Sequence, residues 1–98
     1  MTINIKRDGT KMYAQLAGRL DTSTAVDAEA KLKDGIETVT DLELDFKELD
    51  YISSSGLRLL LSLQKIMNKQ GSMKITNVNE IVSEVFEVTG FSDILNIQ

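Results

Sequence analysis

Three consecutive serine hydroxyls stand at the entrance to the most apolar segment of the chain, in the stretch DYISSSGLRLLL, at Ser53, Ser54 and Ser55. A serine hydroxyl can attack an acyl group when a neighbouring base activates it, and it can accept a phosphate group from a kinase. Serine is also frequent in turns and as the residue that caps the start of a helix. From the residues alone the capping role is the more common one, and neighbouring serines can divide the two roles between them.

Serine catalysis lacks its usual supporting residues in this chain. A nucleophile elbow places a glycine two residues before and two residues after the serine, but Ile52 stands where the glycine before Ser54 belongs. The chain has no His and no Cys, so the imidazole base, the thiolate nucleophile and the usual zinc ligands are missing. No GxxxxGK or GxGxxG nucleotide motif occurs either. We therefore expect no enzyme activity, no metal site and no cofactor.

The composition indicates one small globular domain over residues 1–98, because 42% of the residues are apolar and 27% are charged. A net charge of −4 does not help to neutralise phosphates, so we expect no nucleic-acid partner. The longest apolar run, Leu59–Leu61, is far too short to span a membrane, and the N-terminus lacks the apolar region of a secretory signal. We expect a soluble, cytoplasmic protein that does not insert into a membrane.

Five carboxylates lie close together before the serines, at Asp41, Glu43, Asp45, Glu48 and Asp50. Alternate residues of a strand share one face, so we expect alternate members of this set on the solvent side of a strand. We interpret them as a solvated edge and not as a paired-carboxylate or metal site.

Hydrophobic periodicity predicts alternating strands and helices. Alternation over 3–6 and 12–17, with the turn dipeptide Asp8-Gly9 between them, predicts a β-hairpin. The remaining pattern predicts, in order, a helix over about 22–38, a strand over 42–46, a helix over about 55–70, a strand over 73–76 and a helix from about 78 to Gly90. This order, β-β-α-β-α-β-α, implies an α/β fold with a mixed β-sheet and right-handed crossovers.

Polar residues at the expected helix starts indicate the caps. Hydroxyl and amide side chains suitable for capping are found at Thr22, Ser23 and Thr24, at Ser54 or Ser55, and at Asn77, which forms a possible capping box with Glu80. The second helix has one narrow polar stripe, formed by Arg58, Ser62, Lys65 and Lys69. Its other positions are mostly Leu, Ile and Met, so we expect this helix to be largely buried.

A phosphate group would suit the expected position of the serines. Their loop follows a strand and opens a helix, so the hydroxyls lie at the carboxyl end of the sheet, where ligands collect in open α/β folds. A helix N-terminus presents free N–H groups and positive potential, which favour an added phosphate. Gly56 keeps the first turn free of a side chain, so that the backbone of a partner could approach closely.

The stretch DYISSSGLRLLL, preceded by LELDF and by GRLDTSTA further upstream, resembles the STAS domain, and within it the stand-alone anti-sigma factor antagonists of bacteria. The resemblance extends over essentially the whole chain, including the closing VTGFSDIL. GRLD and SSGL are specific as a pair in this order and at this separation. The resemblance implies a single STAS-like domain, with a small sheet of four to five strands and helices packed mainly on one face.

The resemblance also implies a regulatory binding role. Members of this family bind an anti-sigma factor that is also a serine kinase, and so release a sigma factor for transcription. The kinase phosphorylates a serine at the start of the second helix, which breaks the complex, and a serine phosphatase reverses the modification. A phosphoserine dianion would repel an acidic or apolar partner surface that the neutral hydroxyl contacts.

The phosphorylated serine of the family lies two residues before the glycine of SGL, which corresponds to Ser54. The segment from Gly18 to Thr24 matches the first loop, which lies beside the phosphorylation loop. The partner-binding residues implied in this way are Asp21, Thr22, Ser23, Thr24, Ser53, Ser54, Ser55, Gly56 and Arg58. One departure is Ser53, which stands where many members have Asp and is a possible second acceptor of phosphate. With phosphate on Ser54, we expect Ser55 to be the N-cap.

Other roles of STAS domains provide the alternatives. The leading one is a small subunit of a lipid-transport ATPase complex, or a component of a stress-signalling assembly, without a phosphorylation switch. The tail of a sulfate transporter is disfavoured because the chain has no membrane span. A small serine-dependent enzyme is a third alternative, which would require turnover that disappears in a Ser54→Ala variant.

Overall fold

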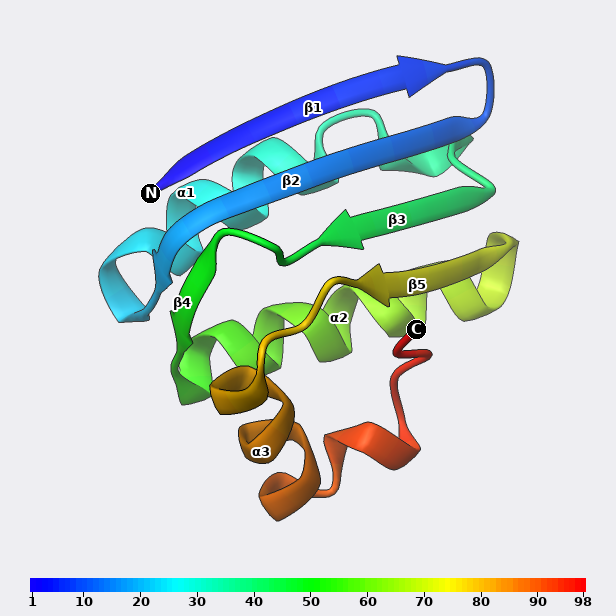
Figure 1. Cartoon of the computed structure of the whole chain (residues 1–98). Helices are drawn as coiled ribbons and strands as arrows, with labels where there is room; N and C mark the ends of the chain where they lie inside the picture. Colours follow the sequence, from blue (N-terminus) through cyan, green and yellow to red (C-terminus); the bar gives the residue numbers. More distant parts are fainter.

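The alternating segments near the N-terminus form an antiparallel hairpin at one edge of a five-stranded sheet (Figure 1). The computed structural model describes residues 1–98. In chain order the elements are β1 (Thr2–Asp8), β2 (Lys11–Leu20), α1 (Thr22–Lys33), the 3-10 helix η1 (Ile36–Thr38), β3 (Asp41–Asp45), β4 (Leu49–Ile52), α2 (Ser54–Gln70), β5 (Ser72–Thr76), α3 (Glu80–Thr89) and the 3-10 helix η2 (Phe91–Asp93). The predicted mixed α/β fold is confirmed.

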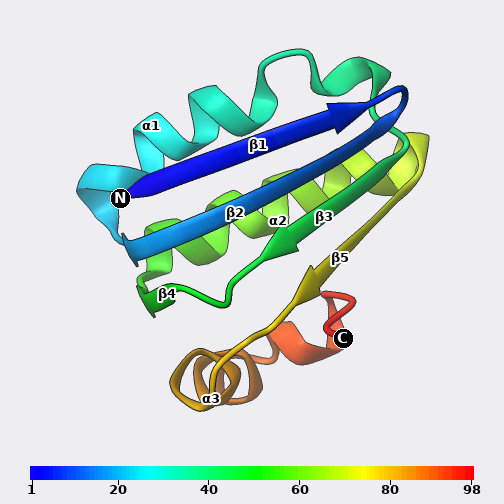
Figure 2. The same cartoon turned by 45° about the horizontal axis from the view of Figure 1, so that its top comes forward.

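The long strand β2 organises the sheet. Its first half pairs in parallel with β3, and its last residues, Gly18–Leu20, pair in parallel with β4. The strand order is β1-β2-β3-β5, with β4 continuing beside β2 beyond the end of β3. Both α1 and α2 lie against one face of this sheet, whereas α3 lies beyond β4 and β5 (Figures 1 and 2). The helices are therefore packed mainly on one side.

Strand β4 was not predicted from the sequence. It has only four residues, of which Leu49 and Ile52 are buried while Asp50 and Tyr51 are exposed. This pattern lacks the period of two that identifies a half-buried strand. Pairing with the end of β2 decides its conformation instead, and the strand leads directly into the serine loop.

The core lies between the sheet and the first two helices. Buried side chains come from the inner face of β2 and β3, from one face of α1 and from α2; the largest contributors include Met12, Leu16, Leu32, Leu42, Leu44, Leu60, Leu63 and Met67. Helix α2 is less enclosed than expected, because Leu61 and Ile66 are only half-buried beside the exposed polar stripe. It presents one buried face to the sheet and one charged face to water.

Helix α1 ends earlier than its apolar spacing predicted. The residues after Lys33 leave the helix, Gly35 adopts a left-handed conformation with φ 71°, and a separate 3-10 turn buries Ile36. Side chains distant in sequence hold this turn. The amide of Gln70, at the end of α2, donates hydrogen bonds to the carbonyls of Ile36 and Val39, at 2.6 and 2.7 Å.

The cap of α3 is Asn79, whereas the sequence pattern had indicated Asn77. The Asn79 side chain accepts a hydrogen bond from the Val82 amide at 2.9 Å and donates one to the Leu49 carbonyl of β4 at 2.7 Å. Asn77 has a left-handed backbone with φ 58°, and its amide donates to a carboxylate oxygen of Asp45 at 3.0 Å. The third helix is thereby attached to β4, next to the serine loop.

Asp45 is the one member of the acidic set that departs clearly from the expected solvated edge. Its side chain is buried and accepts hydrogen bonds from the Tyr13 hydroxyl, the Lys47 amide and the Asn77 amide group. Burial by itself raises the pKa of Asp45, but the hydrogen bonds from these three groups outweigh it and lower the pKa below its usual value. The pKa of Tyr13 is raised to about 12, chiefly by the hydrogen bond between its hydroxyl and Asp45. This cluster joins β2, the end of β3 and the residue after β5.

The ionised Asp45 should stabilise the fold at neutral pH. Because its pKa is lower in the folded than in the unfolded state, its contribution is present above the unfolded-state pKa and is lost as the pH falls through the folded-state pKa. We expect Asp45→Asn to lower the free energy of unfolding at pH 7 and to lose less further stability on acidification than the wild type. Urea denaturation from about pH 7 to pH 2 measures both effects. Asp50→Asn, at an exposed position, controls for the lost charge. If Asp45→Asn lost as much unfolding free energy on acidification as the wild type, the stabilising role of the ionised Asp45 would be contradicted.

The packing of α2 predicts unequal effects for two adjacent leucines. Leu60 is fully buried, whereas Leu61 is half-buried. We expect Leu60→Ala to lower the free energy of unfolding by about 2–5 kcal/mol, through lost burial and the cavity left behind. Leu61→Ala should cost less because part of its side chain already contacts water. Urea denaturation compares the two, and a loss below about 0.5 kcal/mol at Leu60, the scale of a surface change, would show that α2 is misplaced.

Candidate partner-binding and phosphorylation site

The three serines differ in their hydrogen bonds, beginning with Ser53. Ser53 is the N-cap of α2, and its hydroxyl accepts a hydrogen bond from the Gly56 amide at 3.4 Å. Its own amide donates to the carbonyl of Leu20 at 2.9 Å, which fixes the loop to the end of β2. The expectation that Ser55 caps this helix is therefore wrong, because Ser53 is the last residue with an extended backbone.

Ser54 and Ser55 lie in the first turn of α2 with different surroundings. Ser54 is exposed, and its hydroxyl makes no hydrogen bond to another protein group. Ser55 is half-buried; its hydroxyl lies 3.2 Å from the Thr22 hydroxyl and accepts a hydrogen bond from the Arg58 guanidinium at 3.1 Å. Ser54 thus presents the only hydroxyl of the three that is free to react at the surface.

Gly56 is required by the core of the protein itself. It is buried, and a Cβ at this position would lie 2.7 Å from Cγ1 of Ile52 and 2.9 Å from Cγ of Leu20. Both distances are shorter than any tolerated carbon contact. The expectation that the missing side chain makes room for a partner is corrected, since the space is occupied by the ends of β2 and β4.

The first loop has its own capping arrangement, in which Asp21 caps α1. One Asp21 carboxylate oxygen accepts hydrogen bonds from the amides of Ser23 and Thr24, both at 3.1 Å, and the Thr24 hydroxyl accepts from the Asp21 amide at 2.9 Å. The hydroxyl of Ser23 also donates to this oxygen, and together these bonds lower the pKa of Asp21. The expected hydroxyl caps are thus replaced by a carboxylate, which stays ionised beside the serine loop.

The two loops meet in space, as the Thr22–Ser55 contact shows. Between the first turns of α1 and α2 lies a shallow hollow of about 260 Å³, lined by Thr22, Ala25, Val26, Glu29, Ser55, Arg58 and Leu59. Val26 is 74% exposed at its rim. Val26 and Glu29 were not predicted, because neither the periodicity nor the motif distinguishes them from ordinary surface residues of a helix.

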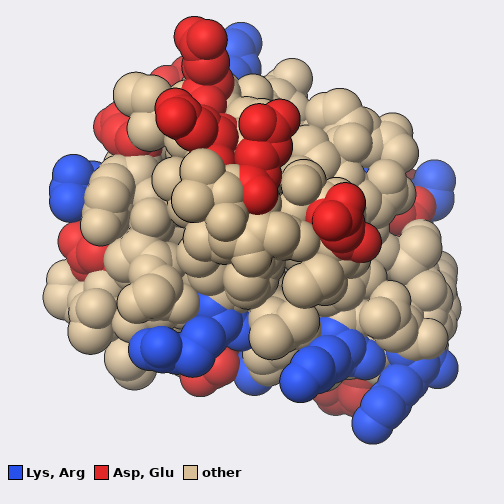
Figure 3. Space-filling model, turned by 90° about the horizontal axis from the view of Figure 1, so that it is seen from below, with Lys and Arg blue, Asp and Glu red and all other residues tan.

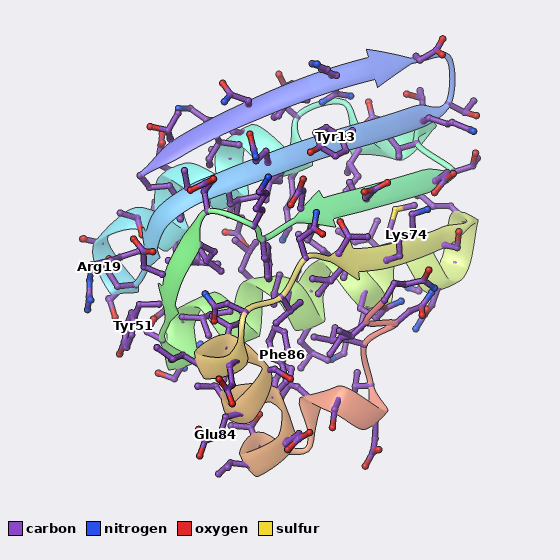
Figure 4. All side chains as sticks on the ribbon, in the orientation of Figure 1. Tyr13, Arg19, Tyr51, Lys74, Glu84 and Phe86 are labelled. Carbon is purple, nitrogen blue, oxygen red and sulfur yellow. The ribbon has the colours of Figure 1, made fainter.

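A second unpredicted feature lies on the other side of the serine loop. Arg19 and Tyr51 are paired across β2 and β4, and the Arg19 guanidinium carbon lies 4.1 Å from the centre of the Tyr51 ring (Figure 4). Tyr51 is 38% exposed, and Arg19 also lies 3.8 Å from an Asp21 carboxylate oxygen. An exposed aromatic ring and a guanidinium are typical of protein-binding surfaces.

Two further observations concern metal binding and membrane insertion. The structure contains no cluster of three side chains that could hold a metal ion. No helix combines the length and the hydrophobicity that crossing a bilayer requires. The arrangement is a polar surface around a free hydroxyl at the start of a helix, in a small domain with a mixed α/β sheet.

The chain belongs to the STAS domain family, which it matches over residues 2–98. It is 30% identical over 98 residues to the anti-sigma-B factor antagonist of Bacillus subtilis, covering 99% of this chain and 90% of that protein. The fold is similar to that of the anti-sigma factor antagonist SpoIIAA in its unphosphorylated form, with a TM-score of 0.79, 21% identity and coverage of 99% of this chain and 87% of the other. It is also similar to the Bacillus cell fate determinant SpoIIAA in its phosphorylated form, with a TM-score of 0.77, 21% identity and coverage of 99% and 91%. These relatives are regulatory proteins and not enzymes.

The separate contacts of the serines predict separate effects on stability. We expect Ser53→Ala to lower the free energy of unfolding by about 0.5–2 kcal/mol, because the cap of α2 is lost. Ser54→Ala should change it by less than about 0.5 kcal/mol, since the hydroxyl bonds to no protein group. Thermal or urea denaturation of the two variants measures the difference. Equal losses for both, or a larger loss for Ser54→Ala, would contradict Ser53 as the cap.

Proposed function

We propose that this protein is an anti-sigma factor antagonist that binds an anti-sigma factor with serine kinase activity and thereby releases a sigma factor. In this proposal, phosphorylation of Ser54 ends the binding and a serine phosphatase restores it. The observation that carries the proposal is the exposed, unbonded Ser54 hydroxyl at the first residue of α2. The 30% identity to the Bacillus subtilis anti-sigma-B factor antagonist supports the partner class. Such a role is carried out in the cytoplasm.

Local contacts favour Ser54 over its neighbours as the acceptor of phosphate. A kinase must bring the γ-phosphate in line with a free hydroxyl oxygen. Ser53 would have to give up its contact with the Gly56 amide, and Ser55 its contacts with Thr22 and Arg58. Ser53 stays a possible second acceptor, because its cap contact is long, at 3.4 Å.

The position of Ser54 suggests how phosphate would act. A dianion at the first residue of a helix interacts favourably with the helix dipole and the free amides, so the fold of this protein is not disturbed. Phosphate on Ser54 would therefore change the binding of the partner and not the fold of this protein. The phosphate would add negative charge near Asp21 and Glu29, which are already paired with Arg19 and Lys33. An acidic or apolar partner surface that fits the neutral hydroxyl would be repelled.

The partner-binding surface in this proposal consists of the two loops around Ser54. It includes Asp21, Thr22, Ser23 and Thr24 on one side and Ser53, Ser54, Ser55 and Arg58 on the other, with the Gly56 backbone behind them. Val26, Arg19 and Tyr51 extend this surface, because they lie beside it and are exposed.

Phosphorylation and binding assays test the proposal. With a cognate anti-sigma factor kinase and ATP, we expect one phosphate on Ser54, located by mass spectrometry. Ser54→Ala should still bind the kinase, whereas Ser54→Asp should bind at least about tenfold more weakly, which corresponds to about 1.4 kcal/mol. Ser92→Asp, which adds the same charge at an exposed serine of η2, should bind like the wild type.

Three results would count against this function. Phosphate found only outside Ser53–Ser55 would exclude the site. Wild-type affinity of Ser54→Asp would exclude the electrostatic mechanism even with the site correct. Stable co-purification with a lipid-transport ATPase, and not with a kinase, would favour the alternative role of a subunit without a switch.

A further inference from the structure

Helix α3 has more apolar surface than its own core contact covers. Val82 and Phe86 are fully buried, and Phe86 points toward α2 (Figure 4). Ile81 and Val88, however, are 65% and 80% exposed, with Val85 half-buried between them. At about 100° per residue, these five positions span a continuous apolar arc of about 160°, of which only one half faces the protein. The other half is an uncovered stripe.

This stripe, Ile81, Val85 and Val88, has the spacing at which side chains line up along a helix. With Glu84 and Thr89 it lines a shallow hollow of about 300 Å³. Other large exposed apolar side chains lie outside α3, such as Val26 on α1 and Ile94 directly after η2. The stripe therefore differs from single apolar residues scattered over a protein surface, which need no explanation.

The border of the stripe is acidic. Glu80, Glu84 and Glu87 lie along one side of it, and α3 contains no Lys or Arg. None of these three carboxylates forms an ion pair, because the four ion pairs of the structure involve other residues. Seen from below, Asp and Glu gather toward one side of the molecule and Lys and Arg toward the other (Figure 3). The negative charge next to the stripe is thus uncompensated within the protein.

We propose that this face of α3 is a docking surface for an amphipathic helix of a partner protein, with Lys or Arg beside its apolar face. Apolar side chains of that helix cover Ile81, Val85 and Val88, as ridges along one helix fit between those of another. Its cations pair with the row of Glu80, Glu84 and Glu87, which selects a basic helix over an acidic one. No residue of this surface lines the hollow beside Ser54, so docking here is independent of the phosphorylation switch.

The charges disfavour the two other occupants. A second copy related by twofold symmetry would bring two rows of glutamates onto the same interface, where like charges repel. An anionic bilayer attracts helices whose polar face is basic, whereas the polar face of α3 has three carboxylates and no cation. A basic amphipathic helix can cover the apolar stripe and also pair its cations with the acidic border.

Peptide titration of the full chain tests this surface. The probe is a synthetic 18-residue helix with leucines on one face and lysines beside them, and its control has the same leucines with glutamates. By NMR of the labelled protein, we expect shifts centred on residues 81–89 with the lysine peptide and at least about tenfold weaker binding of the glutamate peptide. Val88→Asp should abolish binding, whereas Val26→Asp, which changes an equally exposed apolar residue of α1, should preserve it. Circular dichroism verifies that both variants are folded.

Ser54→Asp should bind the lysine peptide like the wild type, which separates this proposal from the function of the serine loop. Shifts away from α3, or equal binding of the two peptides, would overturn it. So would a wild-type dimer that Val88→Asp converts to a monomer in sedimentation, because the occupant is then a second copy. Binding to phosphatidylglycerol vesicles that Val88→Asp abolishes would overturn it in favour of a membrane.

Discussion

The close contact between the first turn of α2 and the ends of β2 and β4 determines how the candidate site is presented. Gly56 lies so near Leu20 and Ile52 that no side chain fits there. Because this turn cannot move outward without losing that contact, the helix start is held in one position, and the bond from the Ser53 amide to the Leu20 carbonyl holds the loop before it. Of the two residues between Ser53 and Gly56, Ser55 is half-buried and Ser54 is exposed to water. A rigid core contact thus produces an exposed hydroxyl.

Most polar side chains around the start of α2 form hydrogen bonds that stabilise the fold, so few of them are available to react. Asp21 and Ser53 cap the two helices, and Ser55 joins the two loops through Thr22. Their hydrogen bonds satisfy amide groups that a helix start leaves without partners. Capping therefore accounts for the hydroxyls and carboxylates of this surface, which include no group of three side chains that could hold a metal ion. Such a surface can be recognised and modified by another protein, and binding there is compatible with a second contact through α3.

Helices α2 and α3 carry charges of opposite sign, with consequences for partner choice. The charged residues of α2, Arg58, Lys65 and Lys69, are all basic, and those of α3 are all acidic. The net charge of −4 therefore hides a strong separation of sign. Surfaces of opposite charge can orient different partners, because complementary potentials favour one approach over another. On α3, the uncovered apolar stripe lies beside the acidic row, so this surface offers a partner apolar contacts as well as charge.

Much of the fold could be predicted from periodicity and motifs. The hairpin, three helices, and two of the parallel strands follow from local patterns, because an alternating or helical repeat requires a buried face wherever the segment packs. Strand β4 could not be predicted, since Leu49–Ile52 acquires its conformation by pairing with β2. The end of α1 could not be predicted either, because side chains distant in sequence hold the turn after it. Arg7 donates a hydrogen bond to the Gly35 carbonyl, and Gln70 donates one to the Ile36 carbonyl.

The sequence by itself determined the class of fold, the family resemblance and the three neighbouring hydroxyls. Only the tertiary structure decided how those hydroxyls differ: Ser53 caps the helix, Ser55 contacts Thr22, and Ser54 is free. It also decided that Asp45 is buried and that Gly56 serves the core. The physical reason is the range of the interactions. Helices and strands arise from neighbours along the chain, whereas the burial and bonding of a side chain depend on residues that only folding brings into contact.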